Sequence, residues 1–182
     1  PNRGGTPAFA GDRTPATHLC RMPQSNYERL LELAEETFAV RKDPAQLDVD
    51  EEVLEHLRNI HPATVSERDD GNGPVAWVLL IPTTTELMEA FVSGAITERE
   101  LYERTPVGGV YGAVYLCSAL VLEEYRRQGI TRELALDALE RVRQDHPVSA
   151  LFVWSFSPEG RKSAVAIARE AGLPLLERAG KG

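Results

Sequence analysis

One stretch of the chain, residues 111–122, is apolar at both odd and even positions, as in a strand that is covered on both faces of a sheet. Residues 151–156 form another strand-like run. Earlier, the turn sequence Asp-Asp-Gly-Asn-Gly lies between two strand-like runs, which predicts a β-hairpin. In chain order, the predicted strands are 17–22, 63–68, 75–81, 111–122, 151–156 and 173–176.

Between these strands, apolar residues recur every three or four positions, as on one face of an amphipathic helix. Ser25 and Glu28 form a capping box before the first such segment, and Ser157 with Pro158 opens the last. The predicted inner faces are Tyr27, Leu30, Leu31, Ala34 and Phe38; Val53, Leu54, Leu57 and Ile60; Ile130, Leu134, Ala138, Leu139 and Val142; and Ala164, Val165, Ala168 and Ala171.

Residues 83–109 predict two more helices, inserted before the 111–122 strand. Thr97 and Glu100 form a capping box for the second helix. The first carries an apolar stripe of Leu87, Met88, Phe91 and Val92. This stripe either packs on the sheet or forms a wall of an acceptor pocket or an oligomer contact. Long connections with structure of their own are often functional.

Strands and helices alternate along the chain, which predicts an α/β fold with a mixed sheet. The length of 182 residues fits one domain, which we place at 17–182. Residues 1–16 are rich in Gly and Pro and predict a flexible segment. No internal repeat is evident.

The formal net charge of −8 argues against a nucleic-acid partner and favours cationic substrates such as amines. Cys20 and Cys117 lie in apolar segments, which predicts reduced, buried thiols. The four histidines show no metal-ligand spacing, so we expect no metal. No run approaches the roughly 20 apolar residues of a membrane span, and no signal sequence opens the chain. The sequence therefore predicts a cytoplasmic protein without a membrane partner.

The most informative segment runs from Val121 to Leu134, where a strand ends, a polar turn follows and a helix begins. Gly129 lets the backbone approach a ligand closely. The first amides of the following helix have no intrahelical partner and lie at its positive end. The segment therefore predicts an anion site suited to a pyrophosphate, although a solvated basic turn is the alternative.

Residues 126–131, Arg-Arg-Gln-Gly-Ile-Thr, fit the pattern [Arg/Gln]-x-x-Gly-x-[Gly/Ala] at all but the last position. This segment resembles the coenzyme A loop of the GNAT superfamily, the acyl-CoA-dependent N-acetyltransferases. The order of predicted elements over about 17–176 also resembles that fold, whose sheet is mixed and largely antiparallel. The resemblance implies acetyl-CoA, or another acyl-CoA, as the cofactor. The cofactor-binding residues that it implies are Ala119, Leu120, Val121, Arg126, Arg127, Gln128, Gly129, Ile130, Thr131 and Arg132.

The residues that such enzymes commonly use for acid–base catalysis are absent. Eleven positions before Arg126, where several members carry a glutamate, this chain has Tyr115. In the last helix, Arg161 and Ala168 stand where members have asparagine and tyrosine. The polar residues nearest the expected thioester are Tyr115, Ser118, Ser155 and Ser157, of which we take Tyr115, Ser118 and Ser157 as catalytic candidates.

Two functions therefore stay open. The resemblance implies an N-acetyltransferase in which the amine of a small molecule or peptide attacks the thioester directly. The absent acid–base residues favour the alternative, a catalytically inert CoA-binding or protein-interaction module on the same fold. The sequence also leaves open a homodimer.

Overall fold

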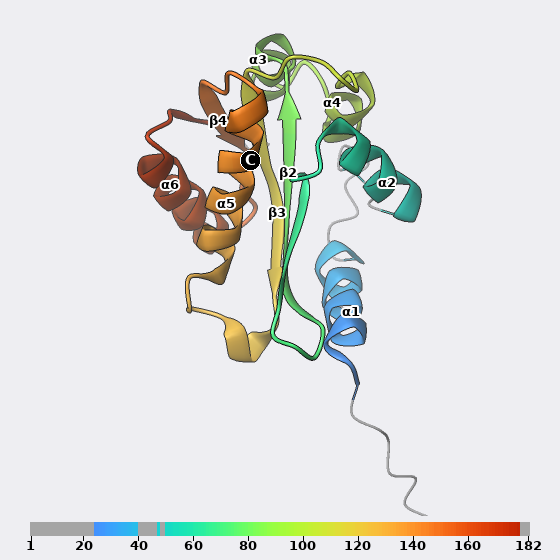
Figure 1. Ribbon diagram of the computed structural model, residues 1–182. Coiled ribbons are helices and arrows are strands. Elements are labelled where there is room, and N and C mark those ends of the chain that lie inside the picture. Colours follow the sequence, from blue (N-terminus) through green and yellow to red (C-terminus); the bar gives the residue numbers. More distant parts are fainter. Residues whose placement is uncertain (1–23, 40–46, 48–49, 179–182) are drawn as a thin grey trace, which may run out of the picture.

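A five-stranded sheet with the strand order β1-β2-β3-β4-β5 forms the centre of the molecule (Figure 1). The computed structural model describes residues 24–39, 47 and 50–178. In chain order its elements are α1 (Asn26–Ala39), α2 (Glu51–Ile60), β1 (Val65–Asp69), β2 (Pro74–Thr83), α3 (Thr85–Val92), α4 (Glu98–Arg104), β3 (Ala113–Val121), the 3-10 turn η1 (Glu123–Tyr125), α5 (Ile130–Asp145), β4 (Ala150–Val153), α6 (Pro158–Ala171) and β5 (Leu175–Glu177). The fold is therefore α/β with a mixed sheet, as the sequence predicts.

The pairing of the strands divides the sheet into two halves. β1, β2 and β3 are antiparallel, whereas β3, β4 and β5 are parallel. In the described part of the chain, two strand pairs are antiparallel and two are parallel, and the antiparallel pairs are the longer ones, so the sheet is mixed and its antiparallel half is the larger.

Helices cover both faces of this sheet, with α5 and α6 on one side and α1 to α4 on the other (Figure 1). Leu80 and Val114 pack beneath α5 and α6. Their strand neighbours Ile81 and Tyr115 belong to the core beneath α2, α3 and α4. This burial on both faces explains why β2 and β3 are apolar at consecutive positions.

The helix-start signals in the sequence are confirmed. The backbone N–H of Ser25 donates to Glu28 Oε2 at 2.8 Å, and Thr97 and Glu100 form the predicted capping box of α4. The hydroxyl of Ser157 accepts from the backbone N–H of Gly160 at 3.0 Å, at the start of α6.

The inner faces of two helices differ from the prediction. In α1, Leu30 is buried, but Tyr27 and Leu31 are 53% and 41% exposed. In α6, Val165 is 48% exposed and Ile167 is buried instead. Positions three and four apart share a helix face, whereas adjacent positions lie about 100° apart, so Ile167 and not Val165 shares the face of Ala164.

The predicted insertion forms the two helices α3 and α4, and its apolar stripe packs on the sheet. Phe91 of α3 is fully buried. Its ring lies 5.0 Å from the ring of Tyr115, 5.8 Å from that of Phe152 and 6.2 Å from that of Trp154, centroid to centroid. Of the roles that the sequence leaves open for the stripe, the structure therefore shows core packing.

The predicted strand at 17–22, the predicted flexible segment 1–16 and Cys20 lie outside the described residues. Among the helices that the structure describes, none combines the length and the apolar character needed to cross a membrane.

Candidate functional site

The strands β3 and β4 run together only at the start of β3. Residues 113–115 pair with 150–152, while the rest of β3 remains paired only with β2. β4 itself ends at Val153, three residues before the predicted end at Phe156. Beyond this point the edge of β3 that faces β4 has no strand partner in the described part of the chain, so its peptide groups on that side can pair with an extended ligand.

A β-bulge in β3 marks the place where the two strands separate. Leu80 of β2 faces Leu116, and the next residue, Leu79, faces Ser118. Cys117 is therefore the extra residue. Because a bulge bends its strand and increases the local twist, it accounts for the divergence of β3 from β4.

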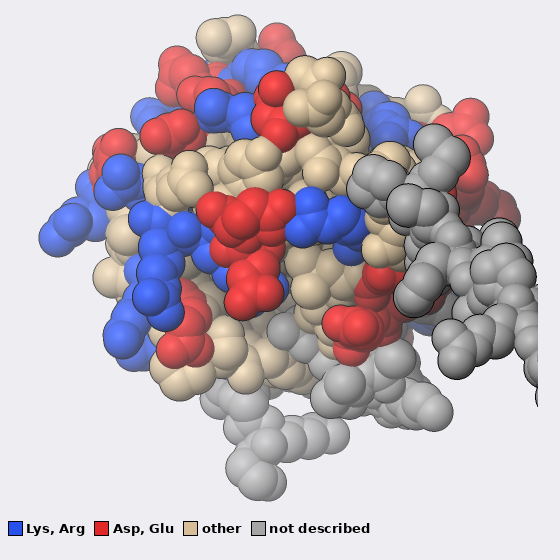
Figure 2. Space-filling view, turned by 90° about the horizontal axis from the view of Figure 1, so that it is seen from below, with Lys and Arg blue, Asp and Glu red and all other residues tan. Residues whose placement is uncertain are grey.

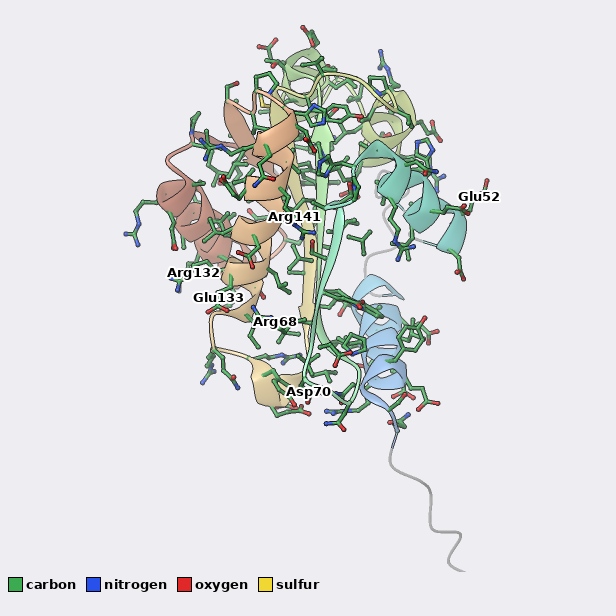
Figure 3. All side chains as sticks on the ribbon, in the orientation of Figure 1. Glu52, Arg68, Asp70, Arg132, Glu133 and Arg141 are labelled. Atoms are coloured by element: carbon green, nitrogen blue, oxygen red, sulfur yellow. The ribbon has the colours of Figure 1, made fainter. Side chains whose placement is uncertain are left out.

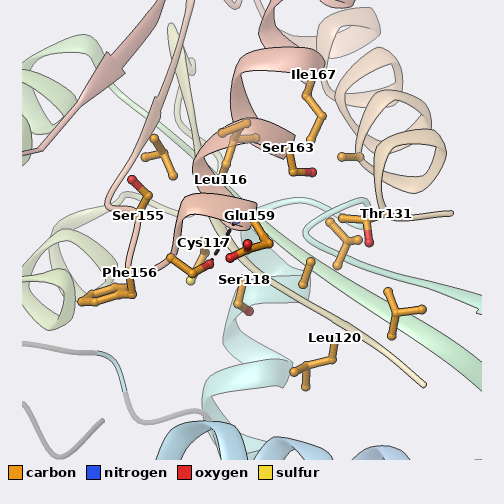
Figure 4. A pocket seen from close by; sticks show the side chains of 18 of the residues that line it. Leu116, Cys117, Ser118, Leu120, Thr131, Ser155, Phe156, Glu159, Ser163 and Ile167 are labelled. Atoms are coloured by element: carbon orange, nitrogen blue, oxygen red, sulfur yellow. Dashed lines mark hydrogen bonds between the residues drawn. The ribbon is translucent and has the colours of Figure 1, made fainter. Parts of the chain in front are cut away.

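A cavity of about 460 Å³ occupies the space between the separated strands (Figure 4). Its walls come from β2, β3, the segment after β4, α1, α5 and α6. The β3 side is formed by residues 116–121 and the opposite side by residues 153–157. Leu33 and Thr37 of α1 also line the cavity, and so do Ala164 and Ile167 of α6. The lining is mostly apolar, with a few hydroxyl groups, one thiol, one carboxylate and one guanidinium, which is the composition of a small-molecule site.

The cavity leads to the N-terminus of α5. Gly129, the residue before α5, has a φ of 82°, and Arg127 also has a positive φ, 63°. No side chain caps this helix end, and the first helical bond runs from the N–H of Glu133 to the carbonyl of Gly129 at 3.0 Å. The amides of residues 130–132 are therefore available to an anion.

A second cavity of about 330 Å³ surrounds this helix end and adjoins the first. Five residues line both cavities, namely Val121, Arg126, Thr131, Glu159 and Ser163. One continuous channel thus leads from the gap between β3 and β4 to the start of α5. Such a shape suits a long ligand with an apolar arm and an anionic end.

Positive charge gathers at this second cavity although the whole chain carries −8. Arg126, Arg127 and Arg132 line it. Arg126 and Arg127 make no ion pair with any described carboxylate, and Arg132 lies 3.6 Å from Glu170. Figure 2 views the molecule from below and shows a cluster of basic side chains at the left of the face, with acidic and further basic side chains spread over the rest. The local charge favours an anion, although the Glu159 carboxylate opposes it.

The predicted cofactor-binding residues lie along this channel, with one exception. The predicted residues that line one or both cavities are Ala119, Leu120, Val121, Arg126, Arg127, Gly129, Ile130, Thr131 and Arg132. The exception is Gln128, whose side-chain amide donates to the carbonyl of Glu124 at 3.0 Å. Its side chain therefore holds the turn rather than facing the channel.

The three candidate catalytic residues differ in their placement. Ser118 lines the first cavity, and so does Ser157, whose hydroxyl is engaged as the cap of α6. Ser155, the fourth polar residue expected near the thioester, also lines the first cavity, and its hydroxyl donates to Glu177. Tyr115 is fully buried and is not a lining residue. Of the two α6 residues that stand where members of the resembled superfamily have asparagine and tyrosine, Arg161 pairs with Glu177 at 2.7 Å and Ala168 is buried.

Tyr115 is held in its protonated form. Its hydroxyl donates to Glu98 Oε1 at 2.7 Å. Burial, and secondarily the negative charge of Glu98, raise the pKa of Tyr115 well above its ordinary value. The same carboxylate oxygen accepts from the Cys117 thiol at 3.6 Å. Glu98 of α4 thus links the insertion to a residue that lines the cavity, although no residue of 83–109 lines it directly.

The sequence reasoning missed four polar residues of the channel: Thr37, Cys117, Glu159 and Ser163. Figure 4 shows Glu159 and Ser163 on α6, across the gap from Cys117 and Ser118. The signal for the α6 residues was present in the sequence. Gly160, Ser163, Ala164 and Ile167 follow the helix-capping Ser157 at helical spacing and so share one face.

Neither the family models nor the curated proteins compared with this chain match it. The described residues define an α/β protein with a cavity between two diverging strands of its sheet. Within the described ranges, no three His, Cys, Asp or Glu side chains are arranged to hold a metal ion.

Proposed function

We propose that this chain is an acyl-CoA-dependent N-acyltransferase of the GNAT type, which transfers an acetyl or other acyl group to an amine. One observation carries the proposal: the channel between β3 and β4 ends at an uncapped helix N-terminus surrounded by arginines. Coenzyme A has the matching order of parts, a narrow arm with two amides followed by a pyrophosphate.

The residues that would hold the arm lie on the free edge of β3. Beyond Tyr115 this edge has no strand partner among the described residues, so its peptide groups around Ala119–Val121 can pair with the amides of the arm as an added strand does. Ala164 and Ile167 of α6 supply apolar contacts on the other side. Both are small or aliphatic, which leaves room for a slender ligand.

The residues that would hold the pyrophosphate are those of the second cavity. Three unpartnered amides at the start of α5 can donate to phosphate oxygens at the positive end of the helix dipole. Arg126 and Arg127 add charge-assisted donors. Because these arginines have no described carboxylate partner, binding breaks no ion pair of theirs.

The bound thioester would supply an electrophilic carbonyl to an attacking neutral amine. Leu116, Val153 and Trp154 form apolar walls at the inner part of the cavity and limit the access of water. Tyr115 does not act as a base, because it is buried away from the cavity and stays protonated. Ser118 remains a candidate donor to the reacting groups. The net negative charge of the chain favours a cationic acceptor, either a small amine or a peptide.

An acyl-transfer assay tests this function. The full chain is incubated with acetyl-CoA and a panel of polyamines, aminoglycosides, amino acids and peptides, and the release of the CoA thiol is followed. We expect at least one amine to raise thiol release above the rate without protein. A chain that binds CoA but transfers to no amine of the panel would instead favour the alternative, an inert CoA-binding module.

A further inference from the structure

A closed ring of polar contacts holds the turn that precedes the pyrophosphate loop. Asp70, at the tip of the β1–β2 hairpin, accepts from the hydroxyl of Tyr125 in η1. The carboxylate of Glu124, the neighbouring η1 residue, pairs with both terminal nitrogens of Arg29 from α1, at N–O distances of 2.7 and 2.8 Å. Asn26 of α1 closes the ring, since its amide donates to Asp70 at 3.2 Å and its oxygen accepts from Arg29 at 3.3 Å. Figure 3 shows Asp70 at the lower end of the hairpin, beside η1.

Hydrogen bonds within the ring stabilise the charged form of both of its carboxylates. The Tyr125 hydroxyl is the largest cause that holds the pKa of Asp70 below its ordinary value, and Asp70 in turn raises the pKa of Tyr125. The bond to Arg29 likewise lowers the pKa of Glu124. At neutral pH both carboxylates are therefore charged and Tyr125 keeps its proton, so the ring is complete.

The loop after η1 needs such support. Arg127 has a φ of 63°, a left-handed conformation that is strained for a residue with a side chain. Such a conformation persists only where the surroundings fix it. Two side chains of the loop reach back to fixed points: Arg126 Nε donates to the carbonyl of Val121 at 3.2 Å, and Gln128 donates to that of Glu124. Because the ring fixes Glu124 and Gln128 is hydrogen-bonded to the Glu124 carbonyl, the ring also constrains the position of the loop.

We propose that Asp70 and Arg29 are positioning residues for the anionic end of the ligand, acting through Tyr125 and Glu124 on the loop 126–129. The inference rests on the proposed CoA site. The ring is exposed, and exposed ion pairs contribute little to folding because water and salt screen them. Its main effect is therefore on the geometry of the loop, so its loss weakens binding more than it lowers stability.

Isothermal titration of the full chain with CoA, and competition by pantetheine, which lacks the phosphates, test this proposal. For Asp70→Asn and for Tyr125→Phe we expect about tenfold weaker CoA binding, with pantetheine affinity unchanged. The double variant is expected to lose no more than Tyr125→Phe alone, because that change removes the donor of the bond that Asp70→Asn only weakens by replacing a charged acceptor with a neutral one. The melting temperature serves as the measure of folding and should change by only a few degrees.

The matched control is Asp69→Asn, one position away in the same turn. Among the described residues, the Asp69 carboxylate accepts from the amides of Gly71 and Gly73 within the turn and from no residue of η1, so the variant makes the same change of charge without altering a contact of η1. We expect its CoA affinity to equal that of the wild type. Ring variants that bind CoA within twofold of wild type, or that lose CoA and pantetheine equally, overturn the positioning role. A wild-type chain that does not bind CoA overturns the proposed function itself, and this inference with it.

Discussion

The replacement Gly129→Asp is expected to weaken CoA binding by at least about 100-fold. A carboxylate at this position would lie beside the amides of residues 130–132, where the pyrophosphate is proposed to bind. Two like charges about 4 Å apart repel each other by roughly 4 kcal/mol at an effective dielectric constant of about 20. That energy corresponds to about a thousandfold in affinity, and the exposure of the loop reduces it. Isothermal titration calorimetry with CoA gives the measurement.

Gly129→Asn is the control for the backbone of the same position. Gly129 has a φ of 82°, so any side chain at this position strains the backbone, although an added Cβ would meet no atom closer than 3.8 Å. Asparagine tolerates this conformation and has the shape of aspartate without its charge. We expect Gly129→Asn to keep most of the affinity. Equal CoA affinity in folded Gly129→Asp and wild type would place the anion site elsewhere.

The replacement Phe91→Ala is expected to destabilise the fold by about 3–5 kcal/mol, the range for removing a fully buried phenylalanine. Phe91 lies among the rings of Tyr115, Phe152 and Trp154, and the Arg178 guanidinium stacks on it at 4.5 Å. A cavity at this place would loosen the point where β3 and β4 are still paired. Urea unfolding measures the loss, as a lower midpoint.

Val107→Ala is the matched control within the same insertion, because Val107 is 53% exposed. Its expected change in unfolding free energy is within about 0.5 kcal/mol. A large loss of unfolding free energy in Phe91→Ala beside a small one in Val107→Ala would show that the insertion is part of the core and is not a lid. If Phe91→Ala unfolded at the same urea concentration as the wild type, α3 would not be part of the core.

Features fixed by local chemistry were predictable from the sequence. The hairpin turn, the caps at Ser25, Thr97 and Ser157, and the strand–turn–helix unit around Gly129 each depend on residues close together in the chain. The apolar run at 111–122 likewise located β3.

Features that depend on distant partners were not predictable. The apolar run from Leu151 continues to Phe156, but β4 ends at Val153 because β3 has turned away at the Cys117 bulge. A bulge has no signature of its own in an apolar strand. The contact of Tyr115 with Glu98 joins residues 17 positions apart across an inserted helix, so the strand pattern alone could not show that this phenol faces away from the cavity.

A crystal structure of the full chain with bound CoA tests the central claim most directly. The account predicts the arm of the ligand between β3 and β4, with its amides paired to the backbone of residues 119–121 and its pyrophosphate on the amides of residues 130–132. CoA bound elsewhere on the chain, with the gap between the two strands closed by side chains, would contradict it.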